Sequence, residues 1–204
     1  NTYAKLTDAT NKNSLYDSYF KAFRWSTDRL DPNHGGIIAF VSNGAWIDGN
    51  SADGFRKSME IEFSSMWVFN LRGNARTQGE LRQKEAGNVF GGGSRTPISI
   101  ALLVNNPKIK ADKATIHYYD IGDYLSREEK LTKIAKFISV ANADITWKIL
   151  EPNVDGDWIS QRNDIFETFI PFDEEKSNSI WKVGLYCRGL EKSRDSWLYN
   201  SYKS

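Results

Sequence analysis

Basic side chains that could bind a phosphate are concentrated between positions 72 and 95. This stretch carries five basic side chains against two acidic ones, with glycines interspersed. The basic side chains are Arg72, Arg76, Arg82, Lys84 and Arg95. Guanidinium groups on a flexible, glycine-containing segment are suited to phosphate contacts. A long connection inside a compact domain is usually functional or disordered. A solvated charged loop is therefore the alternative interpretation.

The end of this stretch combines backbone freedom with an aromatic ring and hydroxyl groups. Gly91–Gly93 can take positive φ angles, so the backbone there can turn sharply or approach a ligand closely. Phe90 precedes the glycines, and Ser94 and Thr96 lie where the loop becomes a strand. Ile98–Val104 is short, apolar and rich in branched residues, which predicts a strand buried on both faces. Ligands bind at such strand–loop edges in open α/β sheets.

Several familiar kinds of site are disfavoured. No lysine follows the glycines, and they lead into a strand, so neither a P-loop nor a dinucleotide fingerprint is present. His34, His117 and the single Cys187 lack metal-ligand spacing, and we expect no metal site. A hydrolase that uses Ser94 or Asp155 is disfavoured because the sequence places no base beside either residue.

The bulk composition indicates one globular domain. The 204 residues are 40% hydrophobic and 13% aromatic, which excludes a disordered chain, and the net charge of +1 makes any basic surface a local one. A single cysteine fits a reducing compartment, so we expect a cytoplasmic protein. No apolar run is long enough for a membrane span. The first residue is Asn1 rather than Met, and we expect the chain to be a piece of a longer protein.

Hydrophobic patterning predicts alternating strands and helices around the basic stretch. We expect helices from about residue 13 or 14 to 30, from 50 or 51 to 63, and after a capping box at 126–129, and strands at 37–41, 66–71, 98–104, 115–120 and 181–186. A strand–helix–strand order predicts a parallel pair with a crossover helix. The predicted fold class is α/β: a mixed, mostly parallel sheet with flanking helices, followed by a less regular α+β C-terminal segment.

Several blocks together resemble a known enzyme family. They are GGIIAFVSN at 35–43, FSSMWVFNLRGN at 63–74 and GGSRTPISI at 92–100, with further matches at 11–17, 120–131 and 188–200. This pattern resembles the later half of a γ-type adenine-N6 DNA methyltransferase. More narrowly, it is similar to that region in bacterial single-polypeptide restriction–modification enzymes, type I-like (ISP) or type IIG-like, which carry helicase-like parts. The resemblance covers nearly the whole chain.

The resemblance implies a partial Rossmann-like methyltransferase sheet and a set of DNA contacts. Residues 1–145 would be the C-terminal half of the methyltransferase core, and 146–204 an extension leading toward a target-recognition region near Asp195–Tyr199, with a single compact unit expected. Double-stranded DNA would be the partner. Because a base modified inside a duplex must be flipped out and held by stacking, Phe90 is the candidate stacking residue. The implied DNA-binding residues are Arg72, Arg76, Arg82, Lys84, Ser94, Arg95 and Thr96.

Two departures from the family pattern limit what this chain does alone. The family's Asn-Pro-Pro-Tyr turn is missing, since Asn106-Pro107 is followed by Lys108, and so is the glycine loop that receives S-adenosylmethionine. We therefore expect no catalytic residue here, S-adenosylmethionine bound by the parent enzyme but not by this fragment, and no activity of the fragment alone. The alternative is a non-enzymatic α/β module that binds nucleic acid or protein through the 72–95 loop. The sequence leaves the oligomeric state open.

Overall fold

The computed structural model describes residues 2–109, 111–162, 165 and 168. The chain divides into two units, Asn1–Gln161 and Arg162–Ser204, and all the helices and strands described below belong to the first. The strand predicted at 181–186, Cys187, the matching block at 188–200 and the implied recognition region at Asp195–Tyr199 lie outside the described residues.

The first unit contains five α-helices and five strands among its described residues. In chain order they are α1 (Thr2–Leu6), α2 (Ser18–Thr27), β1 (Gly36–Asn43), α3 (Asp53–Glu62), β2 (Ser65–Arg72), α4 (Gly79–Glu85), β3 (Ile98–Asn105), β4 (Thr115–Asp120), α5 (Arg127–Phe137) and β5 (Lys148–Leu150), with short 3-10 turns at Asn13–Tyr16, Gly44–Ile47 and Asn50–Ala52. The predicted α/β class is confirmed. The sequence predicted neither α1 nor α4, because both are short and α4 buries none of its side chains.

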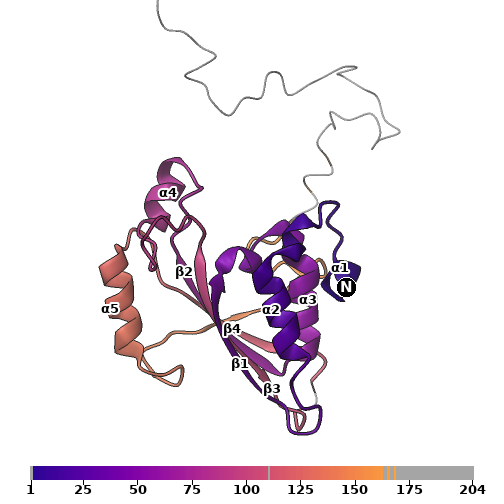
Figure 1. The fold of residues 1–204 in the computed structure, drawn as a ribbon. Coiled ribbons are helices and arrows are strands. Elements are labelled where there is room, and N and C mark those ends of the chain that lie inside the picture. Colours follow the sequence, from indigo (N-terminus) through magenta and orange to yellow (C-terminus); the bar gives the residue numbers. More distant parts are fainter. Residues whose placement is uncertain (1, 110, 163–164, 166–167, 169–204) are drawn as a thin grey trace, which may run out of the picture. The chain divides into compact units, whose positions relative to one another are not determined.

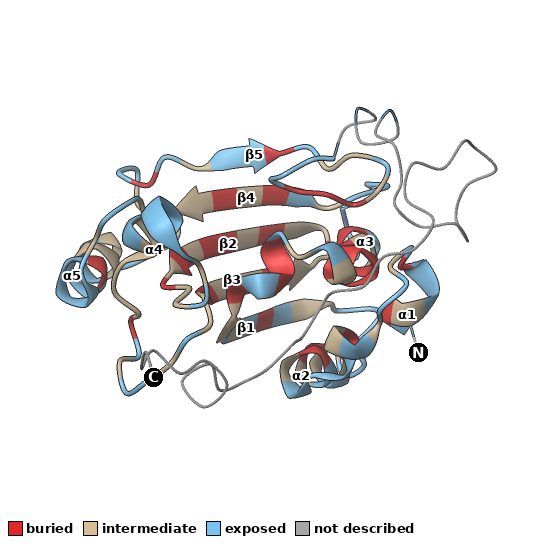
Figure 2. Cartoon of the chain, turned by 90° about the horizontal axis from the view of Figure 1, so that it is seen from above, coloured by how far each residue is buried: buried red, intermediate tan, exposed pale blue. Residues whose placement is uncertain are grey.

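The five strands form one mixed sheet in the order β1-β3-β2-β4-β5, visible side by side in Figure 2. Three of the four pairings are antiparallel and only β2–β4 is parallel, so the expectation of mostly parallel strands was wrong. The connection explains the difference. The loop after Arg72 stays at the end of the sheet where β2 stops. β3 therefore starts at that end and runs antiparallel to β2.

β1 and β2, expected as a parallel pair joined by a crossover helix, are not neighbours. Both pair antiparallel with β3, which lies between them, so they run in the same direction one strand apart. On one face of β3, Ala101 and Leu103 are fully buried, whereas Ile100 and Leu102 on the other face are only half-buried. The prediction of burial on both faces therefore holds fully for one face and partly for the other.

Helices cover the two faces of the sheet unequally. α2 and α3 pack on one face through an aromatic core in which the Phe20 and Phe55 rings meet edge to face at 4.9 Å. α5 covers part of the other face, where Phe137 packs near Phe69 and Ile98 (Figure 1). The aromatic residues between positions 16 and 23 thus pack mainly into the core, although Tyr16 stays 62% exposed.

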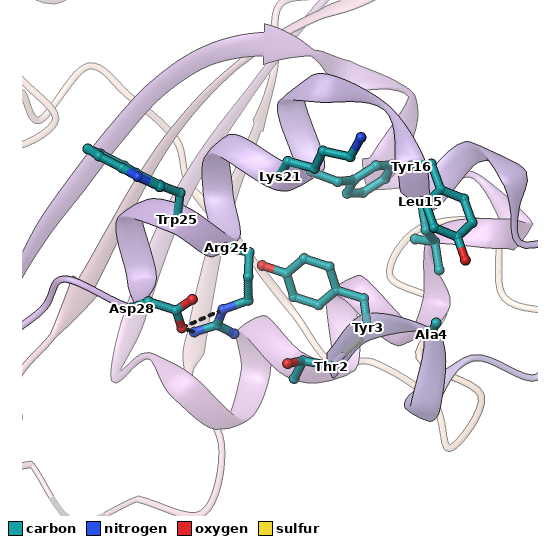
Figure 3. Close-up of a pocket in the computed structure, with 10 residues that line it drawn as sticks. Thr2, Tyr3, Ala4, Leu15, Tyr16, Lys21, Arg24, Trp25 and Asp28 are labelled. Carbon is teal, nitrogen blue, oxygen red and sulfur yellow. Dashed lines mark hydrogen bonds and ion pairs between the residues drawn. The ribbon is translucent and has the colours of Figure 1, made fainter.

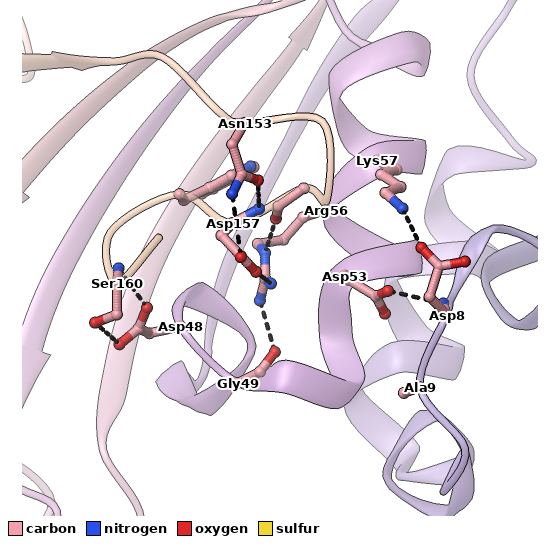
Figure 4. A network of polar contacts seen from close by, with 12 residues as sticks. Asp8, Ala9, Asp48, Gly49, Asp53, Arg56, Lys57, Asn153, Asp157 and Ser160 are labelled. Atoms are coloured by element: carbon pink, nitrogen blue, oxygen red, sulfur yellow. Dashed lines mark hydrogen bonds and ion pairs between the residues drawn. The ribbon is translucent and has the colours of Figure 1, made fainter. Parts of the chain in front are cut away.

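A buried arginine fastens the segment after β5 onto α3 (Figure 4). The Arg56 guanidinium donates hydrogen bonds to the carbonyl oxygens of Gly156 at 2.6 Å, Gly49 at 2.8 Å and Trp46 at 2.9 Å, and its Nη2 lies 3.4 Å from Asp157 Oδ1. A buried charge without partners is very costly. Because Gly156 and Asp157 supply two of the partners of Arg56, the segment is stable only where it can reach the guanidinium.

The capping box predicted before α5 is confirmed. Ser126 Oγ accepts from the Glu129 backbone N–H at 3.2 Å, and the Glu129 carboxylate accepts from the Ser126 N–H at 2.8 Å. Both bonds satisfy N–H groups at the helix start that have no partner within the helix. The bond from the Ser126 N–H to the carboxylate lowers the pKa of the Glu129 carboxyl below its usual range, since it stabilises the ionised form.

Candidate nucleic-acid interface

A cleft of about 470 Å³ lies where β1, β2 and β4 end and β3 begins, and we call it the strand-end cleft. The cleft is lined by Gly44, Ala45, Ile47, Asp48, Gly49, Asn70, Arg72, Asn74, Thr77, Leu81, Glu85, Pro97, Tyr118, Asp120 and Ile159. The 72–95 loop therefore supplies one wall, including Asn74 and residues of α4. The carboxyl edge of a sheet is where ligands bind in open α/β folds.

Arg72 is part of the cleft but is already paired. It ends β2 at a register shift with φ 55°, and its Nε donates to Asp120 Oδ1 at 2.7 Å. Its guanidinium also pairs with Asp123. Although burial lowers the pKa of Arg72, the hydrogen bond to Asp120 and the nearby carboxylates raise it above the ordinary arginine value. Arg72 is thus a permanent cation that ties the end of β2 to the end of β4.

The floor of the cleft is a chain of satisfied polar groups. Tyr118 donates its hydroxyl to Asp120 Oδ2 at 3.1 Å and accepts from Asn70 Nδ2 at 3.0 Å. Asp120 Oδ1 also accepts from the Gly122 N–H at 2.9 Å. Burial raises the pKa of Tyr118 above its usual value, so the phenol stays neutral. Because both oxygens of Asp120 are engaged, this floor is suited to rigid support rather than to proton transfer.

The other predicted cations fall into two groups. Arg76 and Arg95 are exposed and make no ion pair with any residue that the structure describes. They are held close by the backbone, since Ala75 N–H donates to the Arg95 carbonyl at 3.0 Å. On α4, Arg82 donates to the Ala86 carbonyl at 2.8 Å, and Lys84 lies 3.4 Å from Glu80. Arg76 and Arg95 are therefore the cations most open to an external anion.

Phe90 projects from this loop with 62% of its surface exposed. The residue before Phe90, Val89, is buried in the apolar cluster of Phe69 and Ile98 that α5 covers. The three glycines after Phe90 have φ angles of 59°, 57° and 87°. The exposed ring thus lies between a buried residue, Val89, and a glycine segment with positive φ angles. Ser94 and Thr96 contribute backbone groups here: Ser94 N–H donates to Gly91, and the Thr96 carbonyl accepts from Asn88.

Several polar residues of the cleft were not among the residues predicted from the sequence. Asn70, Asn74, Tyr118 and Asp120 lie at or just after strand ends, and that position was the available signal. Their partners were not predictable, since Asn70 and Tyr118 are 48 residues apart in sequence.

A second pocket, of about 380 Å³, lies between α1 and α2 and contains none of the predicted site residues (Figure 3). Its most distinctive group is the buried Tyr3 hydroxyl, which makes no hydrogen bond with the residues described. Burial raises the pKa of Tyr3 above its usual value. Within the described part of the chain, no cluster of three or more metal-ligating side chains occurs, and no helix is long and apolar enough to cross a membrane.

Comparisons with known proteins give solved structures only. No family model matches the chain, and no curated protein matches it. A nuclease-deletion mutant of the Type ISP restriction–modification enzyme LlaGI in complex with a DNA substrate mimic is 44% identical over 86% of this chain, with a TM-score of 0.76. The ATP-dependent Type ISP restriction–modification enzyme LlaBIII bound to DNA is 37% identical over 86%, with a TM-score of 0.79. A DrdV–DNA complex is 32% identical over 80%, with a TM-score of 0.69.

The matched regions are small parts of these neighbours. The chain spans 14% of the LlaGI chain, 12% of the LlaBIII chain and 15% of the DrdV chain. Its structural neighbours thus include Type ISP restriction–modification enzymes, and each of the three structures contains DNA or a DNA mimic.

Proposed function

We propose that this chain is the DNA-facing part of an adenine-N6 methyltransferase region within a restriction–modification enzyme. The observation that carries the proposal is the exposed 72–95 loop beside the strand-end cleft, in a chain 44% identical over 86% of its length to an enzyme bound to a DNA mimic. The sheet gives the loop a rigid base. Residues 146–204 would lead toward the part of such an enzyme that recognises its target, and the enzyme would act in the cytoplasm.

Arg76 and Arg95 are the proposed phosphate contacts. Both are exposed and lie on neighbouring parts of the loop, so together they present two positive charges to one surface. Phosphate contacts release counterions and make binding salt-dependent, whatever the base sequence. Lys84 and Arg82 extend the same basic loop, whereas Arg72 supports it through its aspartates.

Phe90 is the proposed stacking residue for the flipped adenine. Enzymes that do chemistry on a base take it out of the stack and hold it against aromatic or apolar side chains. A ring with 62% of its surface exposed on a basic loop has the accessibility this role needs. Stacking on an aromatic side chain contributes about 1–3 kcal/mol per base.

S-adenosylmethionine supplies the methyl group in such enzymes, and the residues described here do not fit it. The three-glycine run Gly91–Gly93 lies between α4 and β3 rather than at the end of a strand, and the Asp120 carboxylate is fully engaged by Arg72, Tyr118 and Gly122. No step of methyl transfer is therefore assigned to these residues.

The test is the salt dependence of DNA binding by the longer enzyme carrying Arg76→Ala and Arg95→Ala. Log K falls with log salt, and each lost phosphate contact should make this slope less steep by about 0.9. The slope of the double variant should therefore be less steep by about 1.8. Lys5→Ala with Lys21→Ala removes the same charge from exposed positions on α1 and α2 and should leave the slope unchanged. Equal slopes for the wild type and the Arg76/Arg95 variant would refute the phosphate contacts.

Phe90→Ala separates the enzyme from the alternative, a binding module without catalysis. The methyltransferase proposal predicts that this variant retains the salt slope but loses most adenine methylation. Methylation at the wild-type rate would refute the stacking role. DNA binding without any methylation by the wild-type longer protein would favour the module.

A further inference from the structure

The Asn88 side chain makes three hydrogen bonds, which connect both ends of the 72–95 loop to Phe90. Its Nδ2 donates to the Gly73 carbonyl at 3.1 Å and to the Thr96 carbonyl at 2.8 Å. Its Oδ1 accepts from the Phe90 N–H at 3.0 Å. One side chain thus bridges the residue after β2, the residues before β3 and the backbone of the exposed aromatic.

The fit around Asn88 is close. Gly73 has a φ of 90°, and a Cβ added there would lie 2.9 Å from the Asn88 Cα and 3.1 Å from its Nδ2. The glycine therefore provides the space that the amide needs. A side chain at position 73 would displace the segment that carries Phe90.

Side chains of α5 hydrogen-bond the backbone on both sides of Asn88. Buried Lys130 donates from its Nζ to the carbonyls of Glu85 at 2.8 Å and Gly87 at 2.6 Å. Arg127 Nε donates to the Val89 carbonyl at 3.0 Å. The backbone from 85 to 89 is thus bonded to α5, whereas a Cβ added at Gly92 or Gly93 would meet nothing within 4 Å.

We propose that Asn88 is a positioning residue that presents the Phe90 ring for base stacking by clamping Gly73 to Thr96. The inference rests on the proposed function, and it adds a residue that does not itself touch DNA. Its physical basis is pre-organisation: a ring held in its bound geometry loses less conformational entropy when a base stacks on it. Without these bonds, the segment that carries Phe90 loses its attachment to the loop ends, which the Ala75–Arg95 backbone bond still joins, and the ring samples orientations that cannot stack.

The decisive variant is Asn88→Asp, because it separates the two halves of the amide. The carboxylate keeps an acceptor for the Phe90 N–H but cannot donate to the two carbonyls, and it places a negative charge against them. If the local turn alone mattered, Asn88→Asp would behave as the wild type. Asn106→Asp is the matched control, since Asn106 Oδ1 accepts from the Lys108 N–H in a similar turn away from the loop.

The experiment uses the longer enzyme and two duplexes. Fluorescence is read with 2-aminopurine in place of the target adenine, since it reports unstacking and renewed stacking of that base. Methylation is measured on the unmodified duplex, because 2-aminopurine has no amino group at C6. We expect Asn88→Asp to shift the bound-state fluorescence toward that of Phe90→Ala and to slow methylation at least tenfold, with an unchanged salt slope. Asn106→Asp should match the wild type.

The outcomes separate this inference from the proposed function. Wild-type fluorescence and methylation in Asn88→Asp, with a clear effect of Phe90→Ala, would overturn the clamp alone. Wild-type behaviour of Phe90→Ala would overturn the proposed stacking itself. To exclude simple unfolding, every phenylalanine is replaced by 4-fluorophenylalanine, and the signal of position 90 is assigned by its loss in Phe90→Ala. In ¹⁹F NMR, Asn88→Asp should shift that signal while the signals of the core phenylalanines stay unchanged. Altered core signals would overturn the positioning role in favour of a structural one.

Discussion

Replacing Arg56 with methionine tests whether the buried guanidinium holds the segment after β5 onto α3. Arg56→Met keeps most of the apolar stem but removes every donor. The carbonyls of Gly156, Trp46 and Gly49 lose their guanidinium partner, and the buried Asp157 carboxylate loses a positive charge 3.4 Å away. The segment also carries Ile159, which lines the strand-end cleft.

Two estimates of the cost agree. Three hydrogen bonds at about 1 kcal/mol each give about 3 kcal/mol, and breaking a buried ion pair by removing one partner costs about 3–5 kcal/mol. We therefore expect Arg56→Met to lower the free energy of unfolding by about 3–5 kcal/mol. For a chain of this size, that corresponds to a fall in Tm of about 10 °C.

The assay is urea unfolding followed by tryptophan fluorescence, since the Trp46 and Trp158 rings lie edge to face at 5.6 Å across this junction. Lys57→Met is the control: Lys57 neighbours Arg56 on α3 and pairs with the exposed Asp8 at 3.0 Å, so it should cost less than about 1 kcal/mol. A loss below about 1 kcal/mol in Arg56→Met would show that the guanidinium does not hold the segment onto α3.

Two further predictions concern α5. Burial lowers the pKa of Lys130 to about 8 in the folded protein. Between pH 8 and the higher pKa that Lys130 has in the unfolded chain, the unfolded state binds a proton that the folded state has released. The free energy of unfolding therefore rises with pH, by up to about 1.4 kcal/mol per pH unit. Lys130→Met should remove that rise in urea unfolding between pH 8 and 9.5, and an identical pH slope in both proteins would contradict it. Ser126→Ala should cost about 1 kcal/mol through loss of the capping box, while Thr132→Ala on the exposed side of α5 should be near neutral; equal thermal stability of the two variants would count against the cap.

Much of the fold was predictable from local patterns. Short apolar runs marked β1 to β3, the alternation at 115–120 marked β4, and the Ser126–Glu129 spacing marked the start of α5, because each signal lies within a few consecutive residues. Strand order is different, since it depends on which apolar strands pack best at a distance. The absence of a long helix between β2 and β3 was the one clue to their antiparallel pairing.

The site was predictable as a location but not as a set of contacts. The composition of the 72–95 loop identified the basic residues and the exposed aromatic beside the glycines. It could not show that Arg72 is held by Asp120 and Asp123, which follow 48 and 51 residues later. Nor could it show that Asn88 joins the two ends of the loop, because an asparagine before a turn is common and its partners appear only in the folded chain.

The most direct test of the central claim is photocrosslinking from position 90 to DNA. In the longer enzyme, Phe90 is replaced by p-benzoylphenylalanine, which preserves an aromatic ring, and the complex with target duplex is irradiated. If the ring at position 90 stacks on the flipped base, covalent adducts form at the target adenine. None should form from the same replacement at Tyr16, which is equally exposed on the turn before α2. DNA adducts from Tyr16 and none from position 90 would contradict the stacking role.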